Sequence, residues 1–352
     1  MIPESHTPAT ISDVARAAGV STASVSSVIN GKSRVSANTE ARILAAIDSL
    51  GFNINPSARQ LRTGKTGAVG LVVPELNRPY FGQLATHLAD LLEQEGKHLV
   101  MQRSGGSKEQ ELAAASFARL RMYDGVIFSV VDVDPHELER LGFTTPLVLI
   151  GERSGDNRFD HVAMDNVGGA RQAVARLLSR GARRIVLLGG NLNAGIEMSQ
   201  LRTRGYVEEH AATGHHVDES LVVPLDLYDL ESGRAAIHTL VSTGVKFDAI
   251  FAITDVVALG ALRALADLNL RVPQDVQVIG FDNITESEYS SPALTSVDPN
   301  KKEIARTALQ LLAAQTKTSA GAGTEVRDEN GGRATREVVI PTRLVLRETT
   351  LP

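Results

Sequence analysis

The sequence predicts two parts: a small all-α headpiece and a larger α/β core of two lobes, whose parallel sheets have helices on both faces. The first 55 residues contain three short helical segments and no strand pattern. From residue 67, short apolar segments alternate with amphipathic helical segments, which is typical of buried parallel strands joined by crossover helices. These alternating units extend over roughly 230 residues, more than one doubly wound sheet requires, and therefore indicate two lobes.

Capping signals define the three headpiece helices. A hydroxyl side chain that can accept a hydrogen bond from the helix N-terminus precedes each helix, and glycine follows the first and the third. The predicted N-caps are Thr10, Ser21 and Ser36, for helices that end near residues 18, 29 and 50. The headpiece is therefore expected to cover residues 1–52, followed by a polar, breaker-rich hinge over residues 53–66.

The core is expected to cover residues 67–352. Its strand candidates are residues 68–73, 98–101, 125–130, 147–150, 184–188, 247–253 and 276–280. Its helix candidates are residues 81–94, 108–121, 170–180, 233–242 and 256–268. Residues 316–334, which are rich in Gly, Ala, Ser and charged side chains, are expected to form an exposed loop.

Composition and charge exclude several classes of protein. The chain of 352 residues has no cysteine, which rules out disulfides, thiolate metal sites and cysteine nucleophiles and is typical of a cytoplasmic protein. No segment resembles a signal peptide or a membrane span, so no membrane contact is expected. The net charge is −5, yet residues 1–66 carry seven Lys/Arg against four Asp/Glu, so only the headpiece is expected to meet a polyanion.

Enzyme motifs are incomplete in this sequence. Residues 31–33 and 64–66 resemble the end of a phosphate-binding loop but lack its upstream glycine, and no G-x-S-x-G nucleophile motif occurs. His215, His216 and Asp218 fit a solvated loop better than a metal site. We therefore expect no enzyme activity, no cofactor and no metal.

Residues 10–30 have the pattern of a helix-turn-helix. The first helix ends at Gly19, and the second begins with small or hydroxylated side chains from Ser21 to Ser24. Such side chains suit a recognition helix in the DNA major groove, where hydroxyls and backbone amides meet phosphates and the first residues reach base edges. From the spacing alone, a three-helix bundle without DNA-binding activity is the alternative.

This segment resembles the DNA-binding headpiece of the LacI/GalR family of bacterial transcription regulators. The family pattern T-I-x-D-V-A-x-x-A-G-V-S-x-x-T-V-S-R-V-x-N-G is matched by Thr10, Ile11, Asp13, Val14, Ala15, Ala18, Gly19, Val20, Ser21, Val25, Ser26, Val28, Asn30 and Gly31. The resemblance continues through residues 69–74, 79–81, 124–127, 165–166, 255–260 and 280–283. It implies that the two core lobes are similar to those of periplasmic binding proteins.

The resemblance assigns DNA contacts residue by residue. Thr22 and Ala23 would face bases in the major groove, and Leu61, with Ala58 beside it, would enter a minor-groove step and kink the duplex. The other residues expected on the DNA are Thr10, Ser21, Ser24, Ser26, Ser27, Asn30, Arg34, Ser36, Thr39 and Asn55. Ser27 stands where most family members have arginine, so the operator half-site is expected to be read differently.

The resemblance also implies an effector pocket between the core lobes, with a sugar as the expected ligand. Arg202 and Asp255 occupy the family positions of a pocket arginine and a pocket aspartate, which can each form two hydrogen bonds with vicinal hydroxyls. Tyr228 would stack on the ligand, and Tyr80 and Phe81 would form the wall from the other lobe. Without the resemblance, an ion pair at the surface or between the lobes is the alternative for Arg202 and Asp255.

These features together predict a homodimeric repressor that binds a pseudo-palindromic double-stranded DNA operator and a small-molecule effector. In relatives the chain crosses between the lobes three times, which implies a first lobe of residues 67–166 and 299–316 and a second lobe of residues 167–296 and 317–352. Arg78, where relatives often carry asparagine, leaves open a co-repressor-type regulator that answers to a purine, a phosphorylated metabolite or a partner protein.

Overall fold

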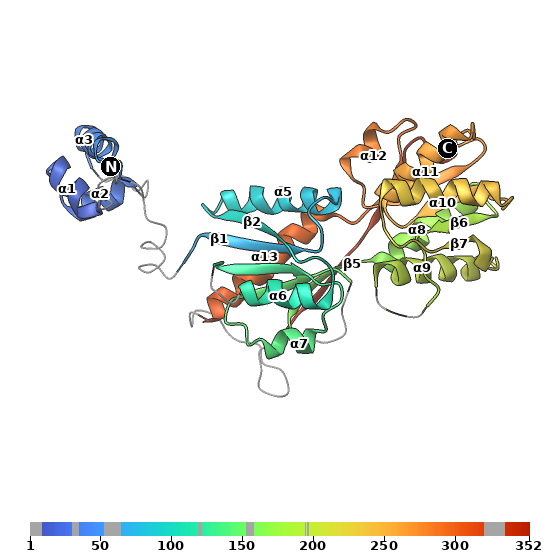
Figure 1. Cartoon of the computed structure of the whole chain (residues 1–352), viewed down its shortest axis with the longest axis horizontal. Coiled ribbons are helices and arrows are strands. Elements are labelled where there is room, and N and C mark those ends of the chain that lie inside the picture. Colours follow the sequence, from blue (N-terminus) through green and yellow to red (C-terminus); the bar gives the residue numbers. More distant parts are fainter. Residues whose placement is uncertain are drawn as a thin grey trace, which may run out of the picture. The chain divides into compact units, whose positions relative to one another are not determined.

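The chain divides into two compact units, Met1–Thr66 and Gly67–Pro352. The computed structural model describes residues 9–29, 35–52, 65–118, 122–152, 158–193, 195, 197–319 and 335–352. Its elements are labelled in Figure 1. Of the predicted hinge, only Lys65 and Thr66 lie within the described residues.

Three short helices make up the described part of the first unit. They are α1 (Ile11–Ala18), α2 (Thr22–Ile29) and α3 (Ala37–Ser49). Thr10 and Asp13 form a capping box at the start of α1, in which the backbone N of Asp13 donates to Thr10 Oγ1 at 3.3 Å. Gly19 ends α1 with a φ of 63°, a left-handed conformation that glycine adopts at little cost. The small core consists of Val14, Ala15, Ala18, Val25, Val28, Ile43 and Ala46.

The first lobe of the core contains a parallel six-stranded sheet in the order β11-β5-β4-β3-β1-β2. Its strands are β1 (Ala68–Val73), β2 (His98–Arg103), β3 (Gly125–Ser129), β4 (Leu147–Ile150), β5 (Asp160–Met164) and β11 (Glu337–Ile340). Helices α5 (Pro79–Glu93) and α13 (Lys301–Ser319) cover one face, and α6 (Lys108–Ala118) and α7 (Pro135–Arg140) cover the other. Accordingly, Val69 and Leu71 of β1 pack with the first pair of helices, and Ala68 and Val72 with the second.

The second lobe repeats this architecture with a sheet in the order β12-β10-β9-β8-β6-β7, in which only β12 is antiparallel to its neighbour. Its strands are β6 (Ile185–Leu188), β7 (Val222–Val223), β8 (Ala249–Ala252), β9 (Gln277–Phe281), β10 (Thr295–Asp298) and β12 (Arg343–Val345). Helices α8 (Asn166–Ser179) and α9 (Met198–Ala212) cover one face, and α10 (Leu230–Ser242) and α11 (Asp255–Asp267) cover the other. A short helix, α12 (Thr285–Tyr289), follows β9, and a 3₁₀ turn, Glu219–Leu221, precedes β7.

After α13, the chain adds a further strand to the first sheet before it enters the second lobe. Residues 337–340 form β11, which pairs in parallel with β5, so that Val338 lies opposite Val162. The prediction that residues 317–352 belong to the second lobe is therefore wrong for β11. The reason is that Ile340 contributes an apolar side chain to the core beside the first sheet, where only 3% of its surface is exposed. Within the described residues the chain passes between the sheets after β5, after β10 and between β11 and β12.

Both sheets have a point at which the strand order reverses. In the first lobe β1 lies between β2 and β3, and in the second lobe β6 lies between β7 and β8. Connections that leave the carboxyl ends of such strands go to opposite faces of the sheet and leave a crevice that commonly binds ligands. The loops that follow β1, β3, β6 and β8 are therefore where a ligand site is expected.

Candidate functional site

The N-terminal end of α2 presents small side chains to solvent. Ser21, Thr22 and Ala23 are exposed, whereas Val25 is buried in the core of the first unit. Ser21 Oγ accepts a hydrogen bond from the backbone N of Ser24 at 3.2 Å and so caps the helix. A narrow helix end of this kind fits a major groove about 12 Å wide.

The other residues predicted to contact DNA fall into three groups. Thr10 and Ser36 are exposed N-caps of α1 and α3, and Thr39 is half-buried beside Ser36, with 2.9 Å between the two hydroxyl oxygens. The half-buried serines of α2 are Ser24, Ser26 and Ser27. The predicted residues that lie outside the described part of the chain are Asn30, Arg34, Asn55, Ala58 and Leu61. Exposed hydroxyls at helix N-termini are suited to phosphate contacts.

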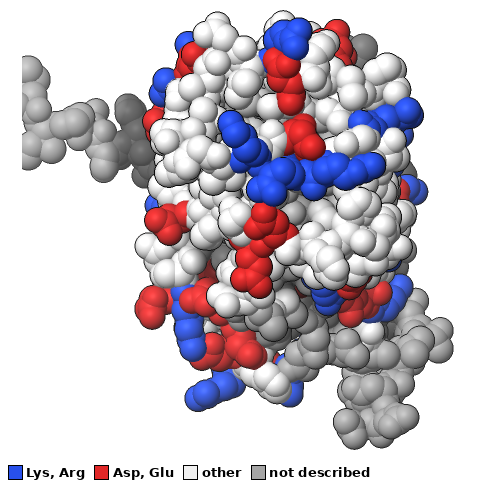
Figure 2. Space-filling model, turned by 90° about the vertical axis from the view of Figure 1, so that its right-hand side faces the viewer, with Lys and Arg blue, Asp and Glu red and all other residues white. Residues whose placement is uncertain are grey.

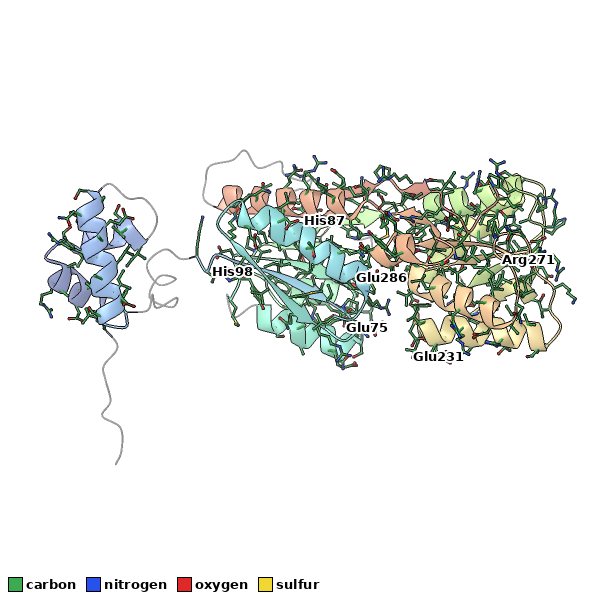
Figure 3. The ribbon with its side chains drawn as sticks, turned by 90° about the horizontal axis from the view of Figure 1, so that it is seen from above. Glu75, His87, His98, Glu231, Arg271 and Glu286 are labelled. Atoms are coloured by element: carbon green, nitrogen blue, oxygen red, sulfur yellow. The ribbon has the colours of Figure 1, made fainter. Side chains whose placement is uncertain are left out.

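A cavity of about 340 Å³ lies between the two lobes of the core. Loops that follow β1 and β3 line it from the first lobe, and loops that follow β6 and β8 line it from the second. Figure 3 labels one of the lining residues, Glu75, at the end of the first lobe that faces the second. Four of the five residues predicted for the effector line this cavity, namely Tyr80, Phe81, Arg202 and Tyr228.

Arg202 of α9 is held rigidly at the wall of the cavity, with only 2% of its surface exposed. Its Nε donates to Asn166 Oδ1 at 2.8 Å, and its Nη1 donates to the main-chain oxygen of Ile253. The guanidinium also lies 3.5 Å from the centroid of the Phe281 ring. Burial lowers the pKa of Arg202, and the nearby carboxylate of Asp282 opposes that shift. The guanidinium is therefore preorganised, with little freedom to turn towards another partner.

Asp282 follows β9 and lines the cavity beside Arg202, with 3.6 Å between its Oδ1 and the arginine Nη2. Burial raises the pKa of Asp282 to about 7, although Arg202 acts in the opposite direction. Asp282 and Asn283 have φ values of 116° and 47°, which L side chains seldom adopt. Lys301 Nζ donates to the main-chain oxygens of both residues and so supports this conformation from behind.

Asp255 does not line the cavity, contrary to the prediction. Its side chain is fully buried against β9, where the carboxylate accepts hydrogen bonds from Ser296 Oγ at 2.5 Å, Ser287 Oγ at 2.7 Å and the backbone N of Ile284 at 2.9 Å. Burial raises the pKa of Asp255, and the two serine hydroxyls and the backbone N–H oppose that shift. The physical reason is the direction of the side chain: the first residue of α11 points behind the sheet end, not into the cavity. Asp255 therefore supports the segment that follows Asp282.

Aromatic side chains from both lobes face the cavity. Tyr80 and Phe81 lie in the first turn of α5, with their ring centroids 5.1 Å apart and their planes at 75°. Burial raises the pKa of Tyr80, so its hydroxyl stays protonated. Tyr228 lies in the loop before α10, and the guanidinium carbon of Arg78 is 5.8 Å from its ring centroid. The rings offer apolar faces on which a ligand can stack.

Several lining residues were not recognised from the sequence. Ser129 ends β3, Glu152 and Thr254 follow β4 and β8 by two residues, and Asp282 directly follows β9. All four therefore lie at the carboxyl ends of buried parallel strands, where open α/β sheets bind ligands. A polar residue directly after an apolar strand was the signal that could have found them.

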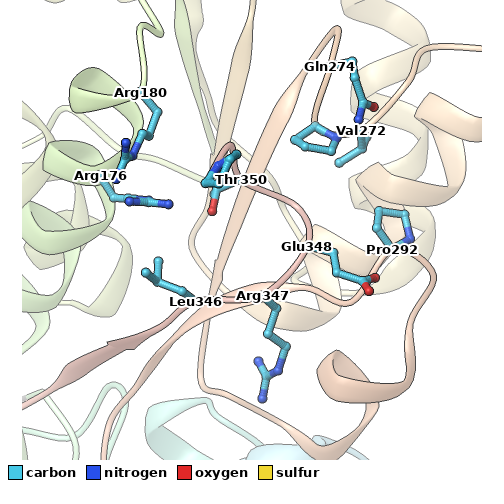
Figure 4. A pocket seen from close by; sticks show the side chains of 11 residues that line it. Arg176, Arg180, Val272, Gln274, Pro292, Leu346, Arg347, Glu348 and Thr350 are labelled. Carbon is cyan, nitrogen blue, oxygen red and sulfur yellow. The ribbon is translucent and has the colours of Figure 1, made fainter.

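A second hollow, open to solvent, lies on the second lobe (Figure 4). Among its lining residues are Arg176 and Arg180, and Arg176 Nη2 donates to the main-chain oxygen of Leu351 at 2.5 Å. The face of this lobe remote from the first shows a band of Lys and Arg with acidic residues on either side (Figure 2). Arg271 at that end, labelled in Figure 3, pairs with Asp275 at 2.6 Å. The cavity between the lobes is the stronger candidate for a ligand site, because loops at the carboxyl ends of strands from both sheets line it.

The described residues contain neither a metal-binding cluster nor a membrane-spanning helix. No group of three or more His, Asp or Glu side chains in that part of the chain could hold a metal ion. No helix in the same part is long and apolar enough to cross a membrane.

The chain matches two protein-family models. Residues 10–55 match the model for bacterial regulatory proteins of the lacI family, and residues 174–350 match the model for a periplasmic binding protein-like domain. Catabolite control protein A of Priestia megaterium is 33% identical over 86% of this chain and 91% of its own length. The HTH-type transcriptional regulator CelR of Thermobifida fusca is 35% identical over 86% of this chain and 90% of its own. The solved structure of a transcriptional regulator CelR–cellobiose complex covers 97% of this chain and 99% of its own, with a TM-score of 0.68 at 31% identity.

Proposed function

Because the chain belongs to the LacI family of bacterial regulatory proteins, we propose that it is a homodimeric repressor whose affinity for its operator changes when a sugar binds between its core lobes. Family membership makes the chain a DNA-binding transcription regulator with an effector-binding core, and its relatives are regulators, not enzymes. The sugar, the dimer, the repressor activity and a cytoplasmic location are the parts that we propose.

On the operator, α2 would act as the recognition helix. Its exposed residues Thr22 and Ala23 would reach base edges, and the exposed hydroxyl caps Ser21 and Ser36 would meet phosphates. One headpiece reads one half-site, so a two-fold dimer is the arrangement that matches a pseudo-palindromic operator.

The ligand assignment depends on one observation: Arg202 and Asp282 lie side by side in a cavity with aromatic walls. A guanidinium carries five N–H donors, so those of Arg202 that are not bonded to Asn166 or Ile253 can donate to a ligand hydroxyl, and a carboxyl group can accept from one. Tyr80 and Tyr228 supply flat apolar surfaces for the ring of the ligand. The relative CelR, solved as a complex with cellobiose, supports a sugar as the ligand.

The route from ligand to DNA would be a shift between two arrangements of the lobes. The cavity takes side chains from both lobes, so a ligand that contacts both favours one arrangement over the other. In the part of the core that the structure describes, the chain crosses between the lobes after β5, after β10 and between β11 and β12. Coupling free energies of this kind are about 1–3 kcal/mol, which corresponds to ~5–150-fold in operator affinity.

The test is a thermal-shift screen of the purified chain against neutral monosaccharides and disaccharides, with purines as the contrasting class. A ligand at 100 times its Kd adds about 2.7 kcal/mol to the free energy of unfolding, which raises the midpoint visibly. We expect a neutral sugar to raise the midpoint, to lose that effect in Asp282→Asn, and to change the affinity for an operator selected from random DNA. A purine as the stabilising ligand, or a full shift in Asp282→Asn, would contradict the proposal.

A further inference from the structure

We infer that the interlobe cavity selects a neutral sugar and excludes anionic ligands, sugar phosphates included. This inference rests on the proposed function and extends it, because it names the charge that the effector must not carry. It also addresses Arg78, the residue for which the sequence allowed a phosphorylated effector as an alternative.

Acidic side chains outnumber basic ones around the cavity. The lining carboxylates belong to Glu75, Glu152, Glu197, Asp226 and Asp282, and the lining cations are Arg78 and Arg202. Glu152 is half-buried and Asp282 is buried, so salt screens them less than the exposed Glu197 and Asp226. A phosphate monoester carries about −1.5 to −2 charges at pH 7 and would add to this excess of negative charge.

Both cations already have carboxylate partners. Arg78 Nε lies 2.5 Å from Glu75 Oε2, and its guanidinium also faces the Tyr228 ring. Arg202 lies beside Asp282, and its Nε and Nη1 donate to other protein atoms, as described above. A phosphate at either arginine would lie beside the negative charge of the carboxylate that already neighbours it. Arg78 is therefore a weak anchor for an anion.

The helix N-termini at the cavity are also poorly suited to bind an anion. Helix α5 begins with Pro79, which has no N–H to donate. At the start of α9, Glu197 places a negative charge, and its own backbone N donates to Gln200 Oε1 at 3.1 Å. At the start of α11, Thr254 Oγ1 accepts from the backbone N of Val257 at 3.3 Å. The usual anion-binding property of a helix N-terminus is thus reduced at all three ends.

A neutral sugar fits the same set of groups. Ionised carboxylates only accept hydrogen bonds, so they require O–H donors, which every sugar hydroxyl supplies and a fully ionised phosphate does not. Asp282, whose pKa is raised by burial, supplies a carboxyl beside Arg202, which donates. Neighbouring donor and acceptor groups of this kind match the hydroxyls of a polyol.

The test compares, in the full chain, the neutral sugar that stabilises it most with the 6-phosphate of that sugar, by calorimetric titration. Inorganic phosphate alone is a third ligand, which requires no knowledge of the effector. We expect the neutral sugar to bind at least about tenfold more tightly than its phosphate, and we expect the preference to shrink at high salt because part of it is electrostatic. Equal or tighter binding of the phosphorylated sugar would overturn the inference.

A pair of variants assigns the effect to Glu75. Glu75→Gln releases Arg78 and should raise the affinity for inorganic phosphate and for the sugar phosphate by about tenfold. Glu95→Gln is the control, because it removes the same charge from an exposed ion pair with Lys97 that does not line the cavity. A gain of phosphate affinity in both variants, or in neither, would contradict the role that we give to Glu75.

The outcomes separate this inference from the proposed function. A sugar phosphate that binds tightly and alters operator affinity would keep the sugar-responsive regulator and overturn the charge selection. A purine that binds in place of every sugar would overturn the proposed function itself, and the phosphate comparison between Glu75→Gln and Glu95→Gln would still report on the charge of the cavity.

Discussion

Lys301, the first residue of α13, donates a hydrogen bond from Nζ to the main-chain oxygen of Asn283 at 3.0 Å. The same ammonium group donates to the oxygen of Asp282, and only 6% of the lysine surface is exposed. Helix α13 packs on the first sheet, whereas Asp282 and Asn283 follow β9 of the second. One buried lysine therefore links a helix of the first lobe to the strained segment that presents the carboxyl group of Asp282.

Replacing Lys301 by methionine should weaken both stability and the ligand response. Two main-chain oxygens in left-handed segments would lose a charged donor, which we expect to lower the free energy of unfolding by about 1.5–3 kcal/mol. Sugar affinity should fall as well, because Asp282 would no longer be held in position. Denaturant unfolding and calorimetric titration measure the two effects. Lys302→Met, at the exposed neighbouring position of α13, is the control and should change neither.

The raised pKa of Asp282 predicts a pH dependence of stability. Its pKa of about 7 in the folded chain lies above the ordinary aspartate pKa of 3.8, so between these two pH values the folded chain binds more protons than the unfolded chain. The stabilisation that comes from protonated Asp282 is therefore complete below about pH 4. It is lost as the pH rises towards 7, and the free energy of unfolding falls by up to about 1.4 kcal/mol per pH unit.

Asp282→Asn removes this titration. Relative to the natural chain, the variant should gain stability steadily from pH 5 to pH 7 and no further above pH 8. Unfolding midpoints across this range give the comparison. Parallel pH profiles for the two proteins would mean that Asp282 is ionised normally in the folded state.

Replacement by asparagine should lower the stability of the chain at Asp255 and its sugar affinity at Asp282. Asp255→Asn replaces a buried acceptor of three hydrogen bonds and should lower the free energy of unfolding by at least about 2 kcal/mol at neutral pH. Asp282→Asn should not destabilise the chain at that pH but should lose sugar affinity. If Asp255→Asn folds as stably as the natural chain yet binds no sugar, the original assignment of Asp255 as a ligand contact is restored.

The contrast between these two aspartates shows where sequence reasoning stops. Both follow buried strands, and a sequence motif assigns the ligand to Asp255, but a motif does not specify the direction of a side chain. That direction depends on Ser287 and Ser296, which lie more than 30 residues further along the chain. Features that depend on neighbouring residues alone were predicted correctly. Thr10 caps α1, and Gly19 ends it.

Two buried strands were missed for a related reason. In β5, Asp160 is polar yet fully buried, because its carboxylate accepts from the backbone N of Arg336 and from Gln315 Nε2, both at 2.9 Å. In β10, Thr295 and Ser296 are fully buried, and both donate hydrogen bonds to distant segments: the backbone N of Thr295 to Thr349 Oγ1 at 2.8 Å, and Ser296 Oγ to Asp255 Oδ1 at 2.5 Å. Apolar periodicity identifies strands whose residues are buried because they are apolar. It does not detect polar residues whose partners arrive from elsewhere in the fold.

The headpiece provides the last prediction. Ala23 is exposed in the first turn of α2, so Ala23→Glu should leave the helix intact, because an acidic residue is favourable near a helix N-terminus. On DNA, the same carboxylate would face phosphates and base edges and should lower operator affinity at least about tenfold, since every lost 1.4 kcal/mol is a factor of ten. Ala45→Glu is the control, because it places the same side chain at an exposed position in the middle of α3. Operator binding by fluorescence anisotropy, with the unfolding midpoint measured alongside, distinguishes the two. An equal loss in both variants would indicate general repulsion of DNA, whereas a loss confined to Ala23→Glu would identify the end of α2 as the surface that enters the groove.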